Sequence, residues 1–337
     1  MELNSETPVL VTGATGLVGS HVAEYLRSRQ IPTRALARDT SDISALCSWD
    51  VDIVPGDMND EESLARATQD VAVVVHCAAK VGDWGQIDEY RQINVEGLRN
   101  LLSAAEAQST LRRFVQISSL GVYEARDHFG TDETEPLSLK GIDGYTRSKA
   151  EAELLVQERI RAGLPGVILR PGFIYGPRDR TVLPRILARM GDGSFKFLGS
   201  GQQRLNNTYV GNLVEAVRLA IEKDDAVGKV FNITDGALVT KREFASAIAR
   251  RAGLPVPEKS VPLPIVKLVA RGLEAGYRAL GKREAPLPSM ATVKFMGLNL
   301  DFSIERARRE LGYDPPISFE EGMDRTFAWL AAEGMNS

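Results

Sequence analysis

Short apolar runs alternate with helical patterns through the first half of the chain. Val9–Thr12 is an uncharged run, and Gly16–Arg29 after it places apolar residues at helical spacing. Further strands are expected at Thr33–Ala37, Asp52–Val54, Ala72–His76, Arg113–Ser118 and Gly166–Leu169. The helices between them are expected at Glu61–Ala67, Ile87–Ala107 and Tyr145–Arg161. Strands that alternate with helices predict an α/β fold with a doubly wound parallel sheet, covered by helices on both faces.

The pattern changes after Pro171 and becomes mostly helical. Helices are expected at Val182–Met190, Gly211–Lys223, Lys241–Ala252, Ile265–Leu280, Ser303–Leu311 and Ser318–Ala332, with one more strand at Lys229–Ile233. The proline-rich residues 253–264 predict a linker or loop. We therefore expect a sheet domain over residues 1–175, joined again by residues 205–235. Residues 176–204 and 236–337 would form a smaller, mostly helical substrate lobe.

The segment 261–280 contains an amphipathic helix with two open interpretations. Its apolar face is expected to comprise Ile265, Leu268, Val269, Leu273, Tyr277 and Leu280. The helix could simply pack on the sheet domain through this face. Alternatively, the preceding prolines form a hinge region, and the lobe closes over an apolar substrate to exclude water.

Charge and composition narrow the functional classes. The 337 residues carry 41 Lys and Arg against 45 Asp and Glu, a net charge of −4, so nucleic acid is not an expected partner. The two cysteines and three histidines show no metal-ligand spacing, so no metal is expected. No signal peptide or apolar run of membrane-spanning length is visible. The expected location is cytoplasmic.

A glycine-rich turn joins the first strand to the first helix. In Thr12-Gly13-Ala14-Thr15-Gly16-Leu17-Val18-Gly19, the glycines permit a tight turn and close backbone approach. The helix N-terminus would then present free amides to a pyrophosphate. A turn of this composition can also bind nothing, but its strand–turn–helix context favours a Rossmann-type dinucleotide site. The predicted contacts are Gly13, Thr15, Gly16, Leu17, Val18 and Gly19.

The end of the second strand bears on which dinucleotide is used. A ribose-binding acid is expected about 20 residues past the glycine motif, where this chain has Ala37 followed by Arg38. A guanidinium binds a 2′-phosphate, which favours NADP(H) over NAD(H), although Asp39 lies nearby. Asp57, after the third strand, suits the adenine amino group or, equally, a helix N-cap.

Three side chains fall at intervals that suit carbonyl chemistry. Ser118 and Ser119 end a strand, and Tyr145 and Lys149 are four residues apart on one helix face. A nearby ammonium and a cationic nicotinamide would lower the pKa of a tyrosine, which could then exchange a proton with an alcohol or ketone. A tyrosine and a lysine at this spacing are common on surface helices. Their position after Ser-Ser and the glycine turn favours catalysis.

These motifs resemble those of the extended short-chain dehydrogenases/reductases, in the NAD-dependent epimerase/dehydratase superfamily. The resemblance is carried in order by TGATGLVGS, HCAAK, INVEGLRNLL, FVQISSLGVY, YTRSK and LRPGFIYGPRD. The segments HCAAKVGDWG, NNTYVGNLVEAVRLA and FSIERARRELGYDPPISFEEGM are most similar to the 3β-hydroxysteroid dehydrogenase branch. That branch includes sterol-carboxylate decarboxylating dehydrogenases and 2-alkyl-3-oxoalkanoate reductases. Gly211 departs from it, because relatives usually have Asp there.

The resemblance implies site residues that the spacing alone does not give. It identifies Ser119 as the catalytic serine, and it suggests a homodimer through helices 87–107 and 145–161. The implied cofactor contacts, besides Arg38, Asp57, Tyr145 and Lys149, are Met58, Ala78, Ala79, Lys80, Asn94, Pro171, Phe173 and Ile174. Asn94 could instead be satisfied by neighbouring backbone. The candidates for the substrate cleft are Trp84, Tyr123, Arg178, Asn207 and Tyr209, and core packing or a surface role suits each of these equally well.

Three functions fit this scaffold. The first is an NAD(P)-dependent oxidoreductase acting on a hydrophobic hydroxy or keto substrate. The second is a nucleotide-sugar epimerase or dehydratase, which needs arginines for a diphosphate; Arg204 is one position out of place for this, and Met290–Phe302 lacks R-x-G-D. Leu120-Gly121 also replaces the acidic pair that dehydratases place after the serine. The third is a non-catalytic dinucleotide sensor, which often loses the tyrosine or the lysine. These features favour the first function.

Overall fold

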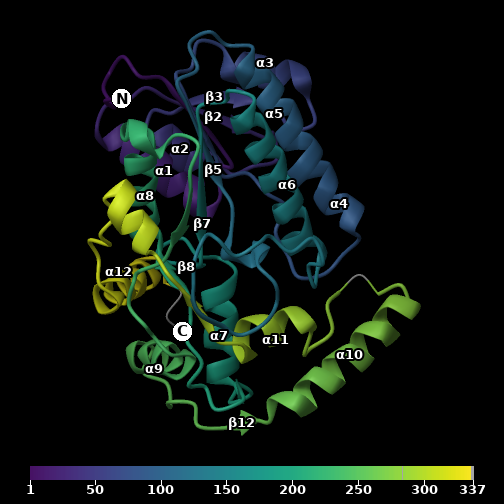
Figure 1. Ribbon diagram of the computed structural model, residues 1–337. Helices are drawn as coiled ribbons and strands as arrows, with labels where there is room; N and C mark the ends of the chain where they lie inside the picture. Colours follow the sequence, from purple (N-terminus) through teal and green to yellow (C-terminus); the bar gives the residue numbers. More distant parts are fainter. Residues whose placement is uncertain (283, 335–337) are drawn as a thin grey trace.

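Seven parallel strands form the central sheet (Figure 1). The computed structural model describes residues 1–282 and 284–334. The sheet order is β11-β7-β5-β4-β1-β2-β3, and each neighbouring pair is parallel. The strands are β1 Val9–Thr12, β2 Thr33–Ala37, β3 Asp52–Pro55, β4 Val73–His76, β5 Arg113–Ile117, β7 Gly166–Pro171 and β11 Val230–Ile233. The predicted doubly wound parallel sheet is confirmed.

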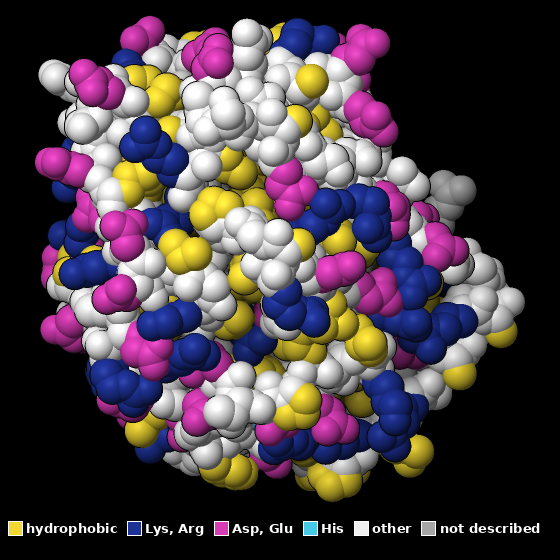
Figure 2. Space-filling view, turned by 45° about the horizontal axis from the view of Figure 1, so that its top comes forward, with side chains coloured by type: hydrophobic (Ala, Val, Ile, Leu, Met, Phe, Trp, Pro, Cys, Tyr) yellow, Lys and Arg dark blue, Asp and Glu magenta, His cyan; other side chains and the backbone are white. Residues whose placement is uncertain are grey.

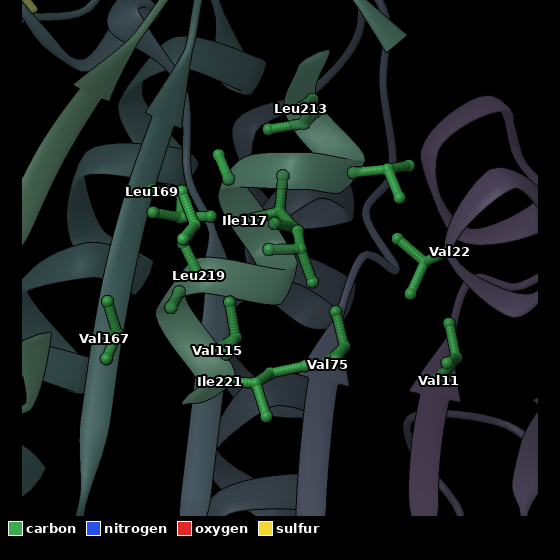
Figure 3. Close-up of a cluster of buried hydrophobic side chains, with 14 of the residues drawn as sticks. Val11, Val22, Val75, Val115, Ile117, Val167, Leu169, Leu213, Leu219 and Ile221 are labelled. Carbon is green, nitrogen blue, oxygen red and sulfur yellow. The ribbon is translucent and has the colours of Figure 1, made fainter. Parts of the chain in front are cut away.

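Helices cover both faces of this sheet. One face packs against α1 (Leu17–Ser28) and α8 (Val210–Glu222). Figure 3 shows Val75 and Val115 of the sheet beside Leu219 and Ile221 of α8. The other face packs against α3 (Glu61–Thr68), α5 (Gly97–Glu106) and α6 (Gly144–Arg161). Strands buried on both faces explain why the sequence shows continuous apolar runs instead of alternation.

The predicted helix 87–107 is interrupted in its first half. It consists of α4 (Ile87–Arg91), a π-helical turn at Gln92–Glu96, and α5. Such turns are often found at functional sites, and this one contains Asn94. A second π turn, Ala307–Leu311, ends the predicted helix 303–311.

The second half of the chain contributes a further apolar cluster. It lies among α7 (Val182–Gly191), α9 (Lys241–Arg251) and α12 (Phe319–Ala332). The elements that the pattern did not predict are short: α2 Ser44–Ser48, β6 His128–Thr131, β8 Phe173–Tyr175, β9 Phe197–Leu198, β10 Asn207–Tyr209, α11 Met290–Gly297, β13 Leu300–Phe302, and 3-10 turns at Leu120–Val122 and Asp224–Ala226. The linker predicted at 253–264 is wrong in part, because it contains β12 (Ser260–Val261) and the start of α10 (Leu263–Ala279).

Helix α10 does not bury the face that the sequence predicted. Its buried residues are Val266, Ala270 and Glu274, whereas Leu268 is 74% exposed and Ile265 is 56% exposed. The inward face packs on α11, an element that the sequence pattern did not reveal. Figure 1 shows α10 beyond α11, away from the sheet. The predicted packing of the stripe against the sheet domain is therefore wrong for Ile265 and Leu268, whereas the ring of Tyr277 does meet Trp84.

The surface carries charges of both signs. Figure 2 shows Lys and Arg intermixed with Asp and Glu over one face. Within residues 1–282 and 284–334, no helix combines the length and the apolar character needed to cross a bilayer.

Candidate active site

The glycine turn lies where the order of the strands reverses. β1 pairs with β2 on one side and with β4 on the other, and ligands of such sheets bind beyond the carboxyl ends of the strands at this point. Gly13 has φ +67°, and a Cβ there would lie 2.7 Å from the backbone nitrogen of Ala78. Only glycine allows this approach, which brings the turn against the segment that follows β4.

The start of α1 suits a pyrophosphate. A Cβ on Gly19 would lie 2.2 Å from the carbonyl oxygen of Gly13, so the turn and the helix are in direct backbone contact. Gly16 is the N-cap and provides no side-chain cap, so the first amides of α1 are not capped by a side chain. These features fit a dinucleotide whose phosphates bind at the helix N-terminus.

The ends of β2 and β3 carry the side chains predicted near the adenosine. Ala37 is buried at the end of β2, and Arg38 directly after it is exposed. The N-cap of α3 is Asp60, whose carboxylate accepts from the backbone nitrogens of Glu62 and Ser63. The alternative role of Asp57 as a helix cap is therefore wrong. Asp57 Oδ1 instead accepts from Asn59, at 3.0 Å from its backbone nitrogen.

The structure brings Ser119, Tyr145 and Lys149 together. Ser119 follows β5, and its hydroxyl is hydrogen-bonded to that of Tyr145 near the start of α6. Lys149 lies one helical turn further on and is buried, and its Nζ donates to the carbonyl oxygen of Ile117 at 2.6 Å. The carboxyl end of β5 therefore carries both Ser119, which interacts with Tyr145, and the Ile117 carbonyl that holds Lys149.

Burial sets the protonation of this group. It raises the pKa of Tyr145 to about 12, with a smaller contribution from the carboxylate of Asp143, and the hydrogen bond with Ser119 opposes the shift. Burial also lowers the pKa of Lys149 to about 8, against the charge of Glu153. The expectation that Lys149 lowers the pKa of Tyr145 is thus not met in the chain alone. At neutral pH the phenol is protonated and can donate its proton.

A buried ion pair lies close to the candidate catalytic residues. Glu153 and Arg170 are 0% and 3% exposed, and Arg170 Nη2 lies 2.5 Å from Glu153 Oε1. Ser118 donates to Glu153 Oε2 at 2.6 Å. Sequence reasoning missed this pair. A glutamate four residues after Lys149, on the helix face that must be buried, was the available signal.

Asn94 connects the segment after β4 with the catalytic helix. Its Oδ1 accepts from the backbone nitrogen of Lys80 at 2.7 Å, and its Nδ2 donates to the Lys80 carbonyl at 3.1 Å and to Ser148 Oγ at 2.9 Å. These contacts satisfy Asn94 within the protein. Lys80 pairs through Nζ with Glu89 at 2.7 Å. Met58 is buried against Gly97, while Ala78 and Ala79 are partly exposed.

The five candidates for the substrate cleft do not lie together. Tyr123, Asn207 and Tyr209 are at most 4% exposed, so we assign them to packing instead of substrate contact. Arg178 pairs with Glu24 of α1. Trp84 contacts the carboxyl-terminal lobe, because its ring meets that of Tyr277 on α10 with the centroids 6.4 Å apart.

Position 211 is a glycine where relatives usually have Asp, and the surrounding residues explain this difference. A Cβ at this position would lie 2.7 Å from the ring of Tyr209. The carboxylate of Asp235 accepts from the backbone nitrogen of Tyr209 at 2.7 Å and from Asn212 Nδ2 at 2.8 Å. Asp235, which follows β11, therefore supplies the carboxylate of this region, and no acid is needed at position 211.

A narrow apolar cavity lies beside β8. The ring of Phe173, which follows Pro171 and precedes Ile174, contacts Phe244 of α9 and Phe295 of α11. The cavity between these helices is lined by Ile186, Phe195, Leu205, Lys241, Phe244, Ala245, Ile248, Phe295 and Met296. Among the described residues, no cluster of His, Cys, Asp and Glu could hold a metal ion.

Comparison with known proteins defines the family. Residues 9–234 match the NAD dependent epimerase/dehydratase family. The chain belongs to this family. A 2-alkyl-3-oxoalkanoate reductase of Shewanella oneidensis is 31% identical, over 95% of this chain and 85% of that protein. A 3-beta-hydroxysteroid dehydrogenase of Mycolicibacterium neoaurum is 32% identical, over 94% and 89%. A decarboxylating sterol-4-alpha-carboxylate 3-dehydrogenase of Schizosaccharomyces pombe is 31% identical, over 99% of both.

Solved structures share the fold of this chain. The crystal structure of gox2253 has a TM-score of 0.82 and 30% identity, covering 97% of this chain and 98% of that one. MoeE5 in complex with UDP-glucose and NAD has a TM-score of 0.75 at 24% identity, covering 97% and 99%, and shares the fold alone. With dehydrogenases and reductases among its relatives, this family member is an NAD(P)-dependent oxidoreductase.

Proposed function

We propose that the protein interconverts a secondary alcohol and a ketone on a hydrophobic substrate, either 3β-hydroxysteroid-like or a β-hydroxy/β-keto acid. The observation that carries this proposal is the hydrogen bond between Ser119 and Tyr145, with Lys149 one helical turn away. This group lies at the same sheet edge as the glycine turn. The names of the three relatives, one for an oxoalkanoate and two for sterols, support a hydrophobic substrate.

The chain's residues would orient the substrate and move the proton. A bound nicotinamide supplies or accepts the hydride. Ser119 would donate a hydrogen bond to the substrate oxygen, and Tyr145 would transfer its phenolic proton to that oxygen as the carbonyl becomes an alcohol. Because the pKa of Tyr145 is raised to about 12, the phenol carries the proton that this transfer needs at neutral pH. Lys149 would hold the nicotinamide ribose and, once freed from Ile117, favour the phenolate that remains.

A nucleotide-sugar epimerase or dehydratase is the alternative. Arg204, the nearest arginine to the expected diphosphate position, donates through Nη1 to the Leu238 carbonyl at 2.6 Å. Gly121, where dehydratases have an acid, would place a Cβ 3.1 Å from Ser119 Oγ. An epimerase or dehydratase would therefore lack both a free arginine for the diphosphate at position 204 and an acid at position 121.

A substrate panel tests the proposal. Dinucleotide absorbance is followed with long-chain β-hydroxy and β-keto acids, a 3β-hydroxysteroid, and a set of UDP- and dTDP-sugars. We expect turnover of at least one hydrophobic substrate and none of the sugars. Turnover confined to sugar nucleotides would overturn the proposal, and dinucleotide binding with no turnover of any carbonyl compound would indicate a sensor.

Cofactor preference gives a separate prediction. Arg38 is exposed just beyond the buried Ala37, where it could reach a 2′-phosphate. We expect NADPH to bind more tightly than NADH, and Arg38→Ala to weaken NADPH by about 2 kcal/mol through loss of a charge-assisted contact. The affinities of both cofactors are measured by fluorescence titration. Arg34→Ala is the matched control, because Arg34 lies four residues earlier, on β2, and is paired with Asp52. Equal affinities in the unmodified protein would contradict the preference.

The proposal also includes a cytoplasmic homodimer. The surfaces expected to pair are those of helices 87–107 and 145–161, which lie side by side on one face of the sheet (Figure 1). Light scattering of the purified protein gives the mass in solution, and a monomeric mass at micromolar concentration would exclude this assembly.

A further inference from the structure

Helix α11 brings a lysine to the catalytic loop. Lys294 Nζ donates to the carbonyl oxygen of Gly121 at 2.9 Å. The backbone nitrogen of the same Gly121 donates to Ser119 Oγ at 2.9 Å. One residue of backbone therefore separates the ammonium of Lys294 from the hydroxyl that is expected to hold the substrate oxygen.

This ammonium has no carboxylate partner among the described residues. No Asp or Glu oxygen of residues 1–282 and 284–334 lies within 4.0 Å of Nζ. The nearest acid that influences it is Asp143, whose Oδ1 accepts from the Thr146 nitrogen at 2.7 Å as the N-cap of α6. Burial lowers the pKa of Lys294 to about 8, and the charge of Asp143 opposes the shift. A half-buried ammonium that donates to one backbone carbonyl still has donors for a charge-assisted hydrogen bond to an anion.

The next residues of α11 form an apolar surface. Phe295 and Met296 line the cavity beside β8, together with Phe244 of α9. The ring of Phe295 lies against Phe173, with the centroids 4.7 Å apart. One helix thus places a positive charge at the loop that follows Ser119 and, at the next two positions, side chains that line an apolar cavity of about 20 Å³. The charge suits an anionic group close to the reacting carbon.

We propose that Lys294 binds a substrate carboxylate, so that the substrate class is β-hydroxy or β-keto acids instead of neutral alcohols and ketones. In such an acid a single carbon separates the reacting carbon from the carboxylate, which matches a cation beside the loop that holds the reacting oxygen. Lys294 is a binding residue in this scheme and takes no part in proton transfer. The inference rests on the proposed oxidoreductase function and narrows its substrate.

The test compares an acid with its own methyl ester. Oxidation of 3-hydroxydodecanoate and of methyl 3-hydroxydodecanoate is measured with saturating NADP⁺ or NAD⁺, because the ester differs from the acid only in one added methyl group and the loss of the charge. Dividing kcat/KM of the acid by that of the ester cancels effects on the shared chemistry. We expect the acid to be preferred, and Lys294→Met to lower the ratio roughly ten- to hundredfold, mainly through KM of the acid, as for loss of a charge-assisted hydrogen bond.

Three further variants make the test specific. Lys294→Arg keeps the charge and should retain most of the preference. Lys267→Met removes a lysine on α10, outside the site, and should leave the ratio unchanged. Lys241→Met removes the buried lysine that lines the apolar cavity. Because Lys294 loses its proton above about pH 8, the ratio should also fall as the pH rises through that value.

Several outcomes would overturn the inference. One is equal use of acid and ester by the unmodified enzyme. Another is an equal loss for both substrates in Lys294→Met, which would show that the lysine only tethers α11. A third is loss of the acid preference in Lys241→Met alone. Should no alcohol or ketone be turned over, the proposed function fails, and calorimetric binding of dodecanoate against dodecanol to the NADP⁺-saturated protein still decides the role of Lys294.

Discussion

Replacing Tyr145 by phenylalanine is expected to lower kcat by about 10²- to 10⁴-fold, the range for loss of a general acid or base. The phenol lies against Ser119 and is held protonated by burial, so its hydroxyl is the proton donor for the substrate oxygen. The dinucleotide would be held by the glycine turn and by Lys149 instead. Its affinity, measured by fluorescence titration, should therefore change little while turnover of NADPH is lost.

Two other substitutions make this result specific. Lys149→Ala should reduce both turnover and dinucleotide affinity, because its ammonium would hold the nicotinamide ribose. Tyr25→Phe, in the last turn of α1 with its ring against Arg29, removes a phenol outside the catalytic group and should leave kcat unchanged. If Tyr145→Phe retains turnover within tenfold of the unmodified enzyme, the assignment of Tyr145 as the proton donor is wrong.

Most strands of the central sheet could be predicted because they are short, mostly apolar and buried runs with polar or glycine neighbours, although β3 (DIVP) is only half-buried. β1 and β2 have the predicted bounds, and the others differ by one or two residues. The two-residue strands β9 and β12 could not be found in this way. They pair Phe197 with Ser260 and Leu198 with Val261, and nothing in either segment alone indicates a partner more than 60 residues away. α11 was missed for a related reason, since its apolar residues face both the cavity and α10.

The residues of the candidate site likewise fall into those that local sequence predicts and those that depend on tertiary packing. Tyr145 and Lys149 follow from local spacing, because they are two positions of one helix. The spacing alone leaves Ser118 and Ser119 open at the strand end, and the family resemblance is needed to choose Ser119. Glu153 and Lys294 do not follow from spacing, because their roles depend on which groups packing brings to them. For Lys294 that group is the carbonyl of Gly121, 173 residues earlier in the chain. The same limit explains Tyr123, whose motif lies next to the serine but whose ring is turned into the interior.

The buried pair of Glu153 and Arg170 gives the second prediction, on stability. Both side chains are almost inaccessible, and the guanidinium contacts the carboxylate through two nitrogens. Replacing Glu153 by alanine leaves Arg170 charged in the interior, with Tyr123 as its remaining partner. Removing one member of such a pair costs about 3–5 kcal/mol. We expect Glu153→Ala to lower the free energy of unfolding by this amount, measured by urea denaturation.

The double variant Glu153→Leu with Arg170→Met distinguishes two explanations of the lost stability: the loss of the attraction between the two side chains, and the burial of one charge without its partner. If the cost arises because one buried charge is left alone, removing both charges should restore much of the stability, so the double variant should be more stable than either single variant. Strictly additive losses would contradict this account.

The pair also bears on the site, because Glu153 accepts a hydrogen bond from Ser118 and its charge raises the pKa of Lys149. Glu153→Gln should therefore lower the pKa of Lys149 below about 8, so that the lysine loses its proton at a lower pH. An alkaline limb of the pH–rate profile that depends on Lys149 would shift in the same direction, whereas a purely structural role for Glu153 would leave its position unchanged.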